Sequence, residues 1–245
     1  MRDEELLSLL RRAADAVGAA VSGQHRLGAS GLRPTQYKAD LLADAAALDV
    51  LHAGGLRVMS EESGATGDGE LTCVLDPIDG STNFDRGIPF YSVSMCVLDE
   101  GLPRCALVRN LATATSYEAV RGAGATRDGA AVRVSAQSAL DSSIVAFSGL
   151  PARHGGWAQF RALGSASLEL CAVADGSLDA YAVVGSSRLS PWDYLGALLV
   201  LQEAGGTIRD AEGLELVEAS SVRRRPVGAA SAVLCDAVIE LVSAP

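Results

Sequence analysis

The spacing of apolar residues predicts two helices joined by a loop at the start of the chain. Leucine, alanine and valine recur every three or four positions between residues 3 and 21, which is the period of an amphipathic helix. The same period over residues 40–53 predicts a second helix, which the following glycine pair ends. The stretch between them, residues 24–36, is polar and rich in glycine, so we expect a mobile loop there.

Two shorter apolar runs predict strands that end at acidic residues. Residues 56–59 predict a strand that delivers Glu61 just beyond its end. Residues 71–75 predict a buried strand that stops at Asp76, because Pro77 lacks a backbone N–H and fixes φ. Both strands therefore end in carboxylates.

Between residues 84 and 138 the pattern changes to short strands separated by turn residues. Turn signals at 99–101, 110–113 and 127–129 divide this part into three or four strands. Consecutive strands with short connections pair antiparallel. We therefore expect a mixed or antiparallel sheet in the N-terminal half.

Beyond residue 138 strands and helices alternate. Apolar runs predict, in order, a strand, a helix, a strand and a helix over residues 144–147, 168–174, 178–184 and 192–204. A Gly-Gly pair follows the last helix, as expected at a helix end. The patterns predict an α+β fold in two halves, residues 1–138 with most of the carboxylates and residues 139–245 as a smaller α/β half.

The composition is that of a folded, acidic protein. Apolar residues make up 49% of the 245 residues, and the formal net charge of −10 argues against a nucleic-acid partner. No apolar run approaches the ~20 residues that span a bilayer, and the acidic N-terminus is unlike a signal peptide. We expect no membrane association and a cytoplasmic location. The five cysteines form no C-x-x-C pair, which is typical of buried reduced thiols.

One basic run, Arg223-Arg224-Arg225, lies before the last predicted strand. Such runs usually lie in solvated loops, and we expect that here. An anion-binding site is the alternative.

The segment Leu75–Phe84 carries the clearest chemistry. It places Asp76 and Asp79 three residues apart at a strand end, and Gly80-Ser81-Thr82 then opens a helical turn with free N–H groups suited to an oxyanion. Carboxylates at a strand end indicate hard cations bound by oxygen ligands. An Asx-turn with a surface aspartate pair is the structural alternative for the tetrad alone.

The same segment resembles the signature of the inositol monophosphatase family of magnesium-dependent sugar and nucleotide phosphatases. Residues 60–64, Ser-Glu-Glu-Ser-Gly, resemble its acidic metal-ligand segment. Residues 191–196, with Glu-Ala-Gly-Gly at 203–206, resemble its C-terminal signature. The resemblance implies a layered α-β-α-β-α sandwich with the site between the halves, and a homodimer.

The resemblance also implies a ligand set for two or three Mg²⁺ ions, for which Mn²⁺ could substitute. Glu61, Asp76 and the carbonyl of Ile78 would hold one ion. Asp76, Asp79 and Asp193 would hold the second, with Asp76 bridging. A third, weaker ion would lean on Glu61 and water. A start-of-helix cap is the alternative role for Asp193.

In the family the hydroxyl that follows the Asp-Gly pair orients the attacking water together with an acidic residue. The corresponding positions here are Ser81 and Asp40, so Asp40, Glu61 and Ser81 are the expected catalytic residues. The backbone amides of Gly80, Ser81 and Thr82 would receive the phosphate oxygens. An ordinary helix cap is the alternative role for Asp40.

The substrate contacts are less defined than the metal ligands. Val183 stands where inositol phosphatases of the family carry a glutamate, so that contact is absent. Ser165 and Ala166, at the start of a predicted helix, match the substrate-facing turn of the family. Arg188 could pair with a second phosphate or a carboxylate, or lie in solvent.

Two readings of function follow. The first is a Mg²⁺-dependent phosphomonoesterase that uses a metal-activated water on a sugar, a cyclitol such as inositol 1-phosphate, or a related small phosphate. Fructose 1,6-bisphosphate, histidinol phosphate and 3′-phosphoadenosine 5′-phosphate are alternative substrates. The second is a non-catalytic or regulatory protein of the same fold that binds a phosphometabolite.

Overall fold

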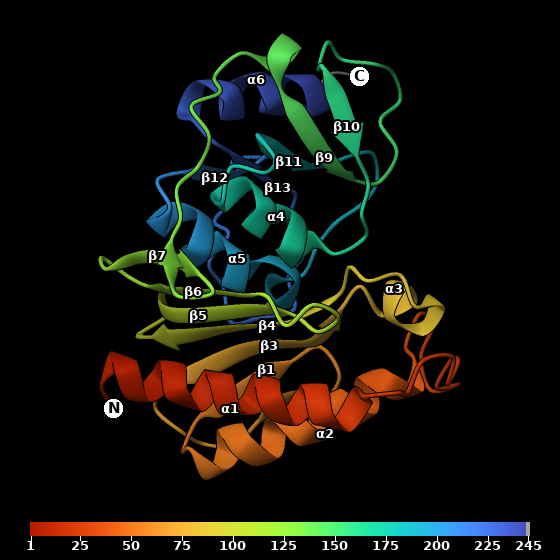
Figure 1. Cartoon of the computed structure of the whole chain (residues 1–245), viewed down its shortest axis with the longest axis vertical. Coiled ribbons are helices and arrows are strands. Elements are labelled where there is room, and N and C mark those ends of the chain that lie inside the picture. Colours follow the sequence, from red (N-terminus) through yellow and green to blue (C-terminus); the bar gives the residue numbers. More distant parts are fainter. Residues whose placement is uncertain (244–245) are drawn as a thin grey trace.

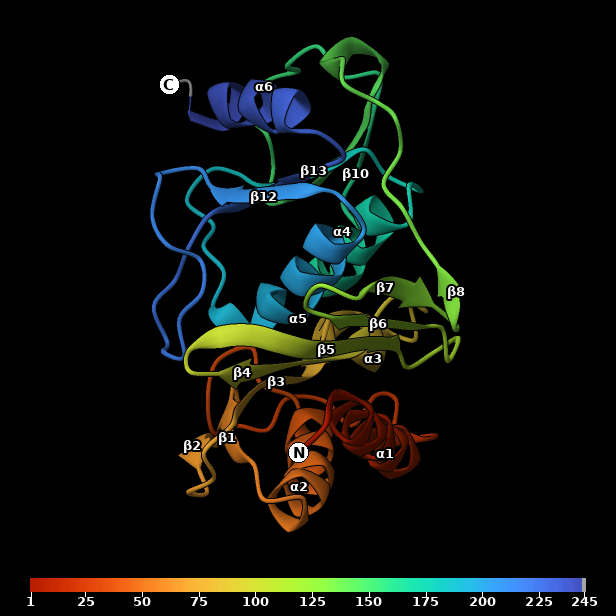
Figure 2. The ribbon, with the colours of Figure 1, turned by 90° about the vertical axis from the view of Figure 1, so that its left-hand side faces the viewer.

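The computed structural model describes residues 1–243 as five stacked layers, helix–sheet–helix–sheet–helix (Figure 1). Helices α1 (Asp3–Val21) and α2 (Lys38–Ala53) form the first layer. Helices α4 (Ala166–Ala174) and α5 (Pro191–Glu203) lie between the sheets, and α6 (Ala232–Ser243) covers the far side (Figure 2). The predicted α+β fold and the layered sandwich are confirmed.

The larger sheet has eight strands in the order β2-β1-β3-β4-β5-β6-β7-β8. Strands β1 and β3 pair parallel, and every other neighbouring pair is antiparallel. The expected mixed sheet is therefore present. Its strands are β1 (Arg57–Ser60), β2 (Gly64–Thr66), β3 (Thr72–Asp79), β4 (Ser92–Asp99), β5 (Leu102–Asn110), β6 (Ser116–Val120), β7 (Gly124–Arg127) and β8 (Ala130–Ala131).

The smaller sheet has five strands in the order β10-β9-β11-β13-β12. Strand β9 pairs parallel with both of its neighbours, and the pairs that involve β13 are antiparallel. Its strands are β9 (Ile144–Ser148), β10 (Gln159–Arg161), β11 (Ala180–Val183), β12 (Thr207–Asp210) and β13 (Pro226–Ala229). A short 3₁₀ helix, η1 (Leu140–Ser142), precedes β9.

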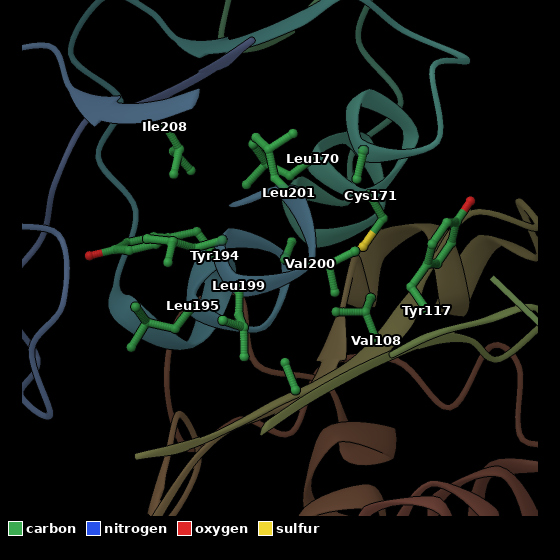
Figure 3. Close-up of a cluster of buried hydrophobic side chains, with 14 of the residues drawn as sticks. Val108, Tyr117, Leu170, Cys171, Tyr194, Leu195, Leu199, Val200, Leu201 and Ile208 are labelled. Atoms are coloured by element: carbon green, nitrogen blue, oxygen red, sulfur yellow. The ribbon is translucent and has the colours of Figure 1, made fainter. Parts of the chain in front are cut away.

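Helix α5 packs against both sheets, and its surroundings explain why it is apolar on all sides. Leu195, Leu199 and Val200 are fully buried in a cluster that also receives side chains from β5 and α4 (Figure 3). A helix that is hydrophobic all round belongs in a protein interior. Because α5 begins at Pro191, its first turn is held where the two sheets approach one another.

The predicted strand end at Asp76 is wrong. Strand β3 runs on through Pro77 to Asp79, and its pairing with β4 is interrupted only between Asp76 and Asp79. Proline is tolerated at such an irregularity because no ladder hydrogen bond is required of its nitrogen. The prediction of three or four strands after residue 84 is also too low, since β4 to β8 make five.

The solvated loop expected for the basic run is wrong for two of its three arginines. The side chain of Arg224 is 10% exposed and donates to a carboxylate oxygen of Glu218 at 2.7 Å. Arg225 is 11% exposed and donates to the backbone carbonyl of Val242 at 2.9 Å. Long cationic side chains can be buried in this way when their charged ends find partners. Arg223 remains exposed.

The other predicted elements agree with the structure. Both N-terminal helices are present, and residues 24–36 form a loop with one isolated bridge, between Ala29 and Tyr37. All five cysteines are buried free thiols. Among the helices of residues 1–243, none combines the length and the apolar character needed to cross a membrane. The division of the chain at residue 138 stays a prediction.

Candidate active site

Carboxylates from three separate elements meet at one edge of the larger sheet. Glu61 follows β1, Asp76 lies in β3, and Asp193 lies in the first turn of α5. Each offers one ligand oxygen, and these oxygens all lie within 4.8 Å of one another. The parallel pairing of β1 with β3 places Glu61 here, because its amide donates to the carbonyl of Leu75 at 3.1 Å.

Burial makes this cluster electrostatically costly without a cation. Asp76 is 2% exposed, and its Oδ1 is buried without a hydrogen-bond partner among the described residues. Burial, together with the neighbouring carboxylates, raises the pKa of Glu61 to about 8 and that of Asp193 to about 7, and raises the pKa of Asp76 well above its ordinary value. Oxygen ligands of this kind fit Mg²⁺, Mn²⁺ or Ca²⁺.

Asp79 lies beside the cluster, and one of its oxygens is already saturated. Its Oδ2 accepts hydrogen bonds from Ser165 Oγ at 2.7 Å, from the Ser167 amide at 2.7 Å, and from Ser167 Oγ. These donors lie at the start of α4, in the other half of the chain. Only Oδ1 of Asp79 is left to face the cluster.

Asp40 and Asp193 each cap the start of a helix with one carboxylate oxygen. Asp40 Oδ2 accepts from the Tyr37 amide at 2.8 Å, and Asp193 Oδ2 accepts from the Ser190 amide at 2.7 Å. Each aspartate is the third residue of its helix, the position that caps the residue before the helix. The second oxygen remains available, and Asp40 Oδ1 is buried without a partner within residues 1–243. The capping alternative is therefore present at both residues, and it leaves one oxygen of each aspartate unused.

Ser81 is the first residue of α3, two positions after the end of β3. Its hydroxyl donates to the carbonyl of Ile78 at 2.8 Å, which engages one lone pair of that expected metal ligand. Burial raises the pKa of Asp40 to about 6, and nearby Ser81 is among the groups that partly offset this effect. Ser81 and Asp40 therefore lie near one another.

The short helix α3 (Ser81–Arg86) begins directly at the carboxylates. Gly80 precedes it with φ +94°, and a Cβ there would lie 3.0 Å from the carbonyl oxygen of Gly164. Because a first helical turn has no internal acceptors for its N–H groups, the amides of Ser81 and Thr82 are free for an anion.

A cavity of about 300 Å³ opens beside Asp79 and Asp193. Ser165 and Ala166 line it, but Ser165 Oγ is committed to Asp79. Arg188 does not line it, because its guanidinium pairs with Glu212 at 2.6 Å. The full lining is Asp79, Phe147, Ser148, Gly149, Ala162, Gly164, Ser165, Ala166, Glu169, Leu189 and Asp193.

Sequence reasoning missed two polar residues of this region. Ser167 holds Asp79, and Glu169 is 1% exposed in the cavity wall, where burial raises its pKa to about 7. A serine and a glutamate within an apolar helical run are a weak signal of a polar pocket. The neighbouring Glu62 accepts hydrogen bonds from Arg33 and Gln36.

Comparisons with known proteins agree with this geometry. A family model described as the inositol monophosphatase family matches residues 7–243. Over 182 residues the chain is 36% identical to the fructose-1,6-bisphosphatase/inositol-1-monophosphatase of Archaeoglobus fulgidus, which covers 73% of this chain and 71% of that protein. It is 37% identical over 161 residues to the inositol-1-monophosphatase of Rhizobium meliloti, with 60% and 59% covered.

A further relative carries a different name. The Nus factor SuhB of Escherichia coli strain K12 is 34% identical over 173 residues, which cover 64% of this chain and 63% of that protein. The chain thus spans less than two thirds of the length of several of these relatives.

Solved structures cover the whole fold. An inositol monophosphatase-fructose 1,6 bisphosphatase superimposes with a TM-score of 0.86 at 25% identity, over 98% of this chain and 100% of the other. The extragenic suppressor protein suhB of Bartonella henselae gives a TM-score of 0.84 at 25% identity, over 97% and 98%.

Proposed function

The chain belongs to the inositol monophosphatase family, and from this premise we propose that it is a Mg²⁺-dependent phosphomonoesterase of small sugar, cyclitol or related phosphates. The observation that carries the proposal is the convergence of Glu61, Asp76 and Asp193 within 4.8 Å, directly before the free amides of α3. A cation-binding cluster next to an oxyanion-binding helix start is what phosphate hydrolysis requires.

The ligands proposed for the first ion are Glu61, Asp76 and the carbonyl of Ile78. Those for the second are Asp76, Asp193 and Oδ1 of Asp79. A third, weaker ion would rest on Glu61. The chemistry that bound Mg²⁺ or Mn²⁺ supplies is neutralisation of phosphate charge and acidification of a coordinated water.

The residues around this set have distinct roles in the proposed reaction. Asp40 Oδ1 and the Ser81 hydroxyl orient the attacking water, since both lie at the start of a helix beside the cluster. The amides of Gly80, Ser81 and Thr82 receive the phosphate oxygens, which the positive end of α3 favours. Ser165 and Ser167 keep Asp79 in place.

The alcohol portion of the substrate is proposed to occupy the cavity beside Asp79, with Ser165, Ala166 and the backbone around them as its wall. Inositol 1-phosphate and fructose 1,6-bisphosphate are the first candidates because the named relatives act on such esters. Histidinol phosphate and 3′-phosphoadenosine 5′-phosphate are further candidates. Contact with a second phosphate through Arg188 requires release of its pair with Glu212.

A second candidate function is a non-catalytic or regulatory role. The SuhB relative, named a Nus factor, is the observation that favours it. The complete carboxylate set of this chain favours catalysis, because a protein without that activity has no need to bury four unneutralised carboxylates. A cytoplasmic homodimer without nucleic-acid or membrane partners remains part of the proposal.

The test is release of inorganic phosphate from inositol 1-phosphate, fructose 1,6-bisphosphate, histidinol phosphate and the nucleotide phosphate, in Mg²⁺ and in EDTA. We expect turnover of at least one ester in Mg²⁺ and none in EDTA. Glu61→Gln should remove it, whereas Glu70→Gln, an exposed control, should not. EDTA-resistant turnover, or full activity of Glu61→Gln, would overturn the metal assignment. No turnover, with tight binding of an ester in Mg²⁺, would favour the regulatory role.

A further inference from the structure

Glu169 is a buried glutamate that the proposed chemistry does not use. It lies on α4, is 1% exposed, and belongs to the wall of the cavity that also contains Asp79 and Asp193. Its Oε1 accepts a hydrogen bond from the Leu163 amide at 2.7 Å. No side chain or amide of the described residues donates to its Oε2. One oxygen is therefore occupied by the fold and the other is not.

The other two carboxylates of the cavity wall and the hydroxyl of Ser165 are committed elsewhere. Ser165 Oγ donates to Asp79, whose Oδ2 is saturated by the start of α4. The carboxylate of Asp193 caps α5 and belongs to the metal cluster. Most of the remaining wall is apolar or glycine, including Phe147 and Leu189. Glu169 is thus the carboxylate of this wall that is free of the cluster and can accept a new hydrogen bond.

The position of Glu169 is fixed through the backbone of Leu163, whose carbonyl and amide both make hydrogen bonds to side chains. Asn83, on α3, donates to the Leu163 carbonyl at 2.7 Å and to the Phe90 carbonyl at 2.8 Å. The Leu163 amide in turn donates to Glu169. The phosphate-receiving helix and the glutamate are therefore linked through the backbone of one residue, Leu163. An acceptor held at a fixed place relative to the phosphate site is preorganised to select a ligand.

The free oxygen indicates the chemistry of its partner. Because Glu169 is 1% exposed, a ligand that donates to its free oxygen is favoured over one that cannot. A cavity of about 300 Å³ suits the alcohol portion of one small ester. In a site built for a phosphate ester, the donors that such a portion brings are hydroxyl groups.

We propose that Glu169 is a specificity residue whose Oε2 accepts a hydrogen bond from a hydroxyl of the substrate alcohol. The site then prefers phosphates of polyols to phosphates of alcohols that carry no second hydroxyl. This inference rests on the proposed phosphatase function and adds to it a residue that selects among the candidate esters.

The test compares inositol 1-phosphate with cyclohexyl phosphate, which keeps the ring and the ester but has no other hydroxyl. For Glu169→Ala we expect kcat/KM on inositol 1-phosphate to fall roughly 10- to 100-fold, mainly through KM, as for loss of a hydrogen bond to a charged group. The value for cyclohexyl phosphate should change less than about threefold. Glu169→Gln can still accept from Leu163, so its structural link persists while the acceptor charge is lost.

Asn83→Ala is the matched structural variant, because it loosens the Leu163 peptide without changing the cavity wall. Glu169 could instead serve only to hold the backbone of Leu163. In that case Glu169→Ala and Asn83→Ala would slow the hydrolysis of the two esters by similar factors. Glu169→Gln would then hydrolyse both esters like the wild type. That result would overturn the inference.

Failure of the proposed function is distinguishable from failure of this inference. If the wild type hydrolyses neither ester, calorimetric titration of both esters in Mg²⁺ replaces the kinetic comparison. Tighter binding of inositol 1-phosphate that Glu169→Ala abolishes would support the hydroxyl site. Equal binding of the two esters to the wild type would overturn it.

Discussion

At the scale of single residues, several carboxylates divide their two oxygens between the fold and the site. Asp40 and Asp193 each cap a helix with Oδ2, which leaves the other oxygen free of the cap. Asp79 is held by serines through Oδ2, and Glu169 holds a peptide through Oε1. One oxygen fixes the orientation of the other, so little conformational freedom remains to be lost when a ligand binds.

Asp193→Asn should separate the helix-capping role of Asp193 from its proposed role as a metal ligand. The asparagine carbonyl can still cap Ser190, so we expect the melting temperature of the metal-free protein to be unchanged or higher. Turnover should fall by more than roughly 100-fold, because a charged ligand is lost. Asp193→Ala removes the cap as well and should cost about 1 kcal/mol of stability. Calorimetry and phosphate release measure both effects. Near wild-type turnover of Asp193→Asn would contradict the ligand assignment.

Ser167→Ala should affect catalysis through Asp79. It removes one of three donors to Asp79 Oδ2, so the carboxylate is held less firmly. We expect kcat to fall roughly tenfold, by analogy with loss of a group that orients a metal ligand. The Mg²⁺ concentration for half-maximal activity should rise. Ser177→Ala, on the exposed surface, is the control, and equal effects of the two substitutions would exclude a specific role for Ser167.

At the scale of elements, the site is built where helices begin. α2, α3, α4 and α5 all direct their first turns toward it, as the positions of Asp40, Ser81, Ser167 and Asp193 show. Helix N-termini carry partial positive charge, which favours both the carboxylates and an incoming phosphate. Strand β3 supplies the remaining acids because its irregular end lets Asp76 and Asp79 lie close together.

Gly80→Ala tests the fit between α3 and the start of α4. Both Gly80 and Gly87 have positive φ, but only at Gly80 would a Cβ meet neighbouring atoms, the closest being Gly164 O at 3.0 Å. We expect Gly87→Ala to cost about 1 kcal/mol and Gly80→Ala about 1–3 kcal/mol. Only Gly80→Ala should also raise KM, because the phosphate-receiving amides shift. Urea denaturation and steady-state kinetics measure the two effects, and equal KM values for both variants would contradict this account.

At the scale of the whole molecule, five layers place a crowded acidic cluster in a poorly hydrated position. Neither half of the chain contains all of it, since Glu61 and Asp76 come from the larger sheet and Asp193 from the central helix layer. The folded protein therefore carries a charge imbalance that a divalent cation relieves. Folding stability should depend on both pH and Mg²⁺.

The sign of the pH dependence follows from the raised pKa values. Burial raises the pKa of Asp40 from 3.8 to about 6, that of Asp193 from 3.8 to about 7 and that of Glu61 from 4.5 to about 8. Between about pH 4 and 8 the folded state thus binds more protons than the unfolded state. In EDTA the contribution of these groups is fully present near pH 4 and is lost as the pH rises toward 8.

Melting temperatures at pH 5, 6, 7 and 8, in EDTA and in Mg²⁺, provide the measurement. We expect the stabilisation by Mg²⁺ to grow with pH, reaching about 2.7 kcal/mol when the ion is at 100 times its Kd. Glu61→Gln should flatten the pH dependence in EDTA, and the exposed control Glu70→Gln should leave it unchanged. A melting temperature in EDTA that rises with pH in the wild type, but not in Glu61→Gln, would show that the sign is wrong.

Much of the fold and part of the site could be predicted because local spacing carries the information. The periods of 3.6 and 2 follow from backbone geometry, so the main helices and most strands were found. The segment Leu75–Phe84 predicted the turn before α3 because glycine and hydroxyl residues have specific backbone preferences. The continuation of β3 beyond Pro77 was missed because its pairing with β4 resumes after the proline, which no local rule reveals.

The sequence by itself determined the order of most helices and strands, the acidic residues available to bind a cation, and the family. The tertiary structure alone decided which oxygen of each carboxylate is occupied and which is free. Asp79 is held by donors 86 and 88 residues away, and Glu169 became part of a cavity wall only when α4 packed beside α5. Which oxygen is occupied depends on packing between elements that are distant in sequence. A buried polar group forms its hydrogen bond with a partner that the fold brings within reach.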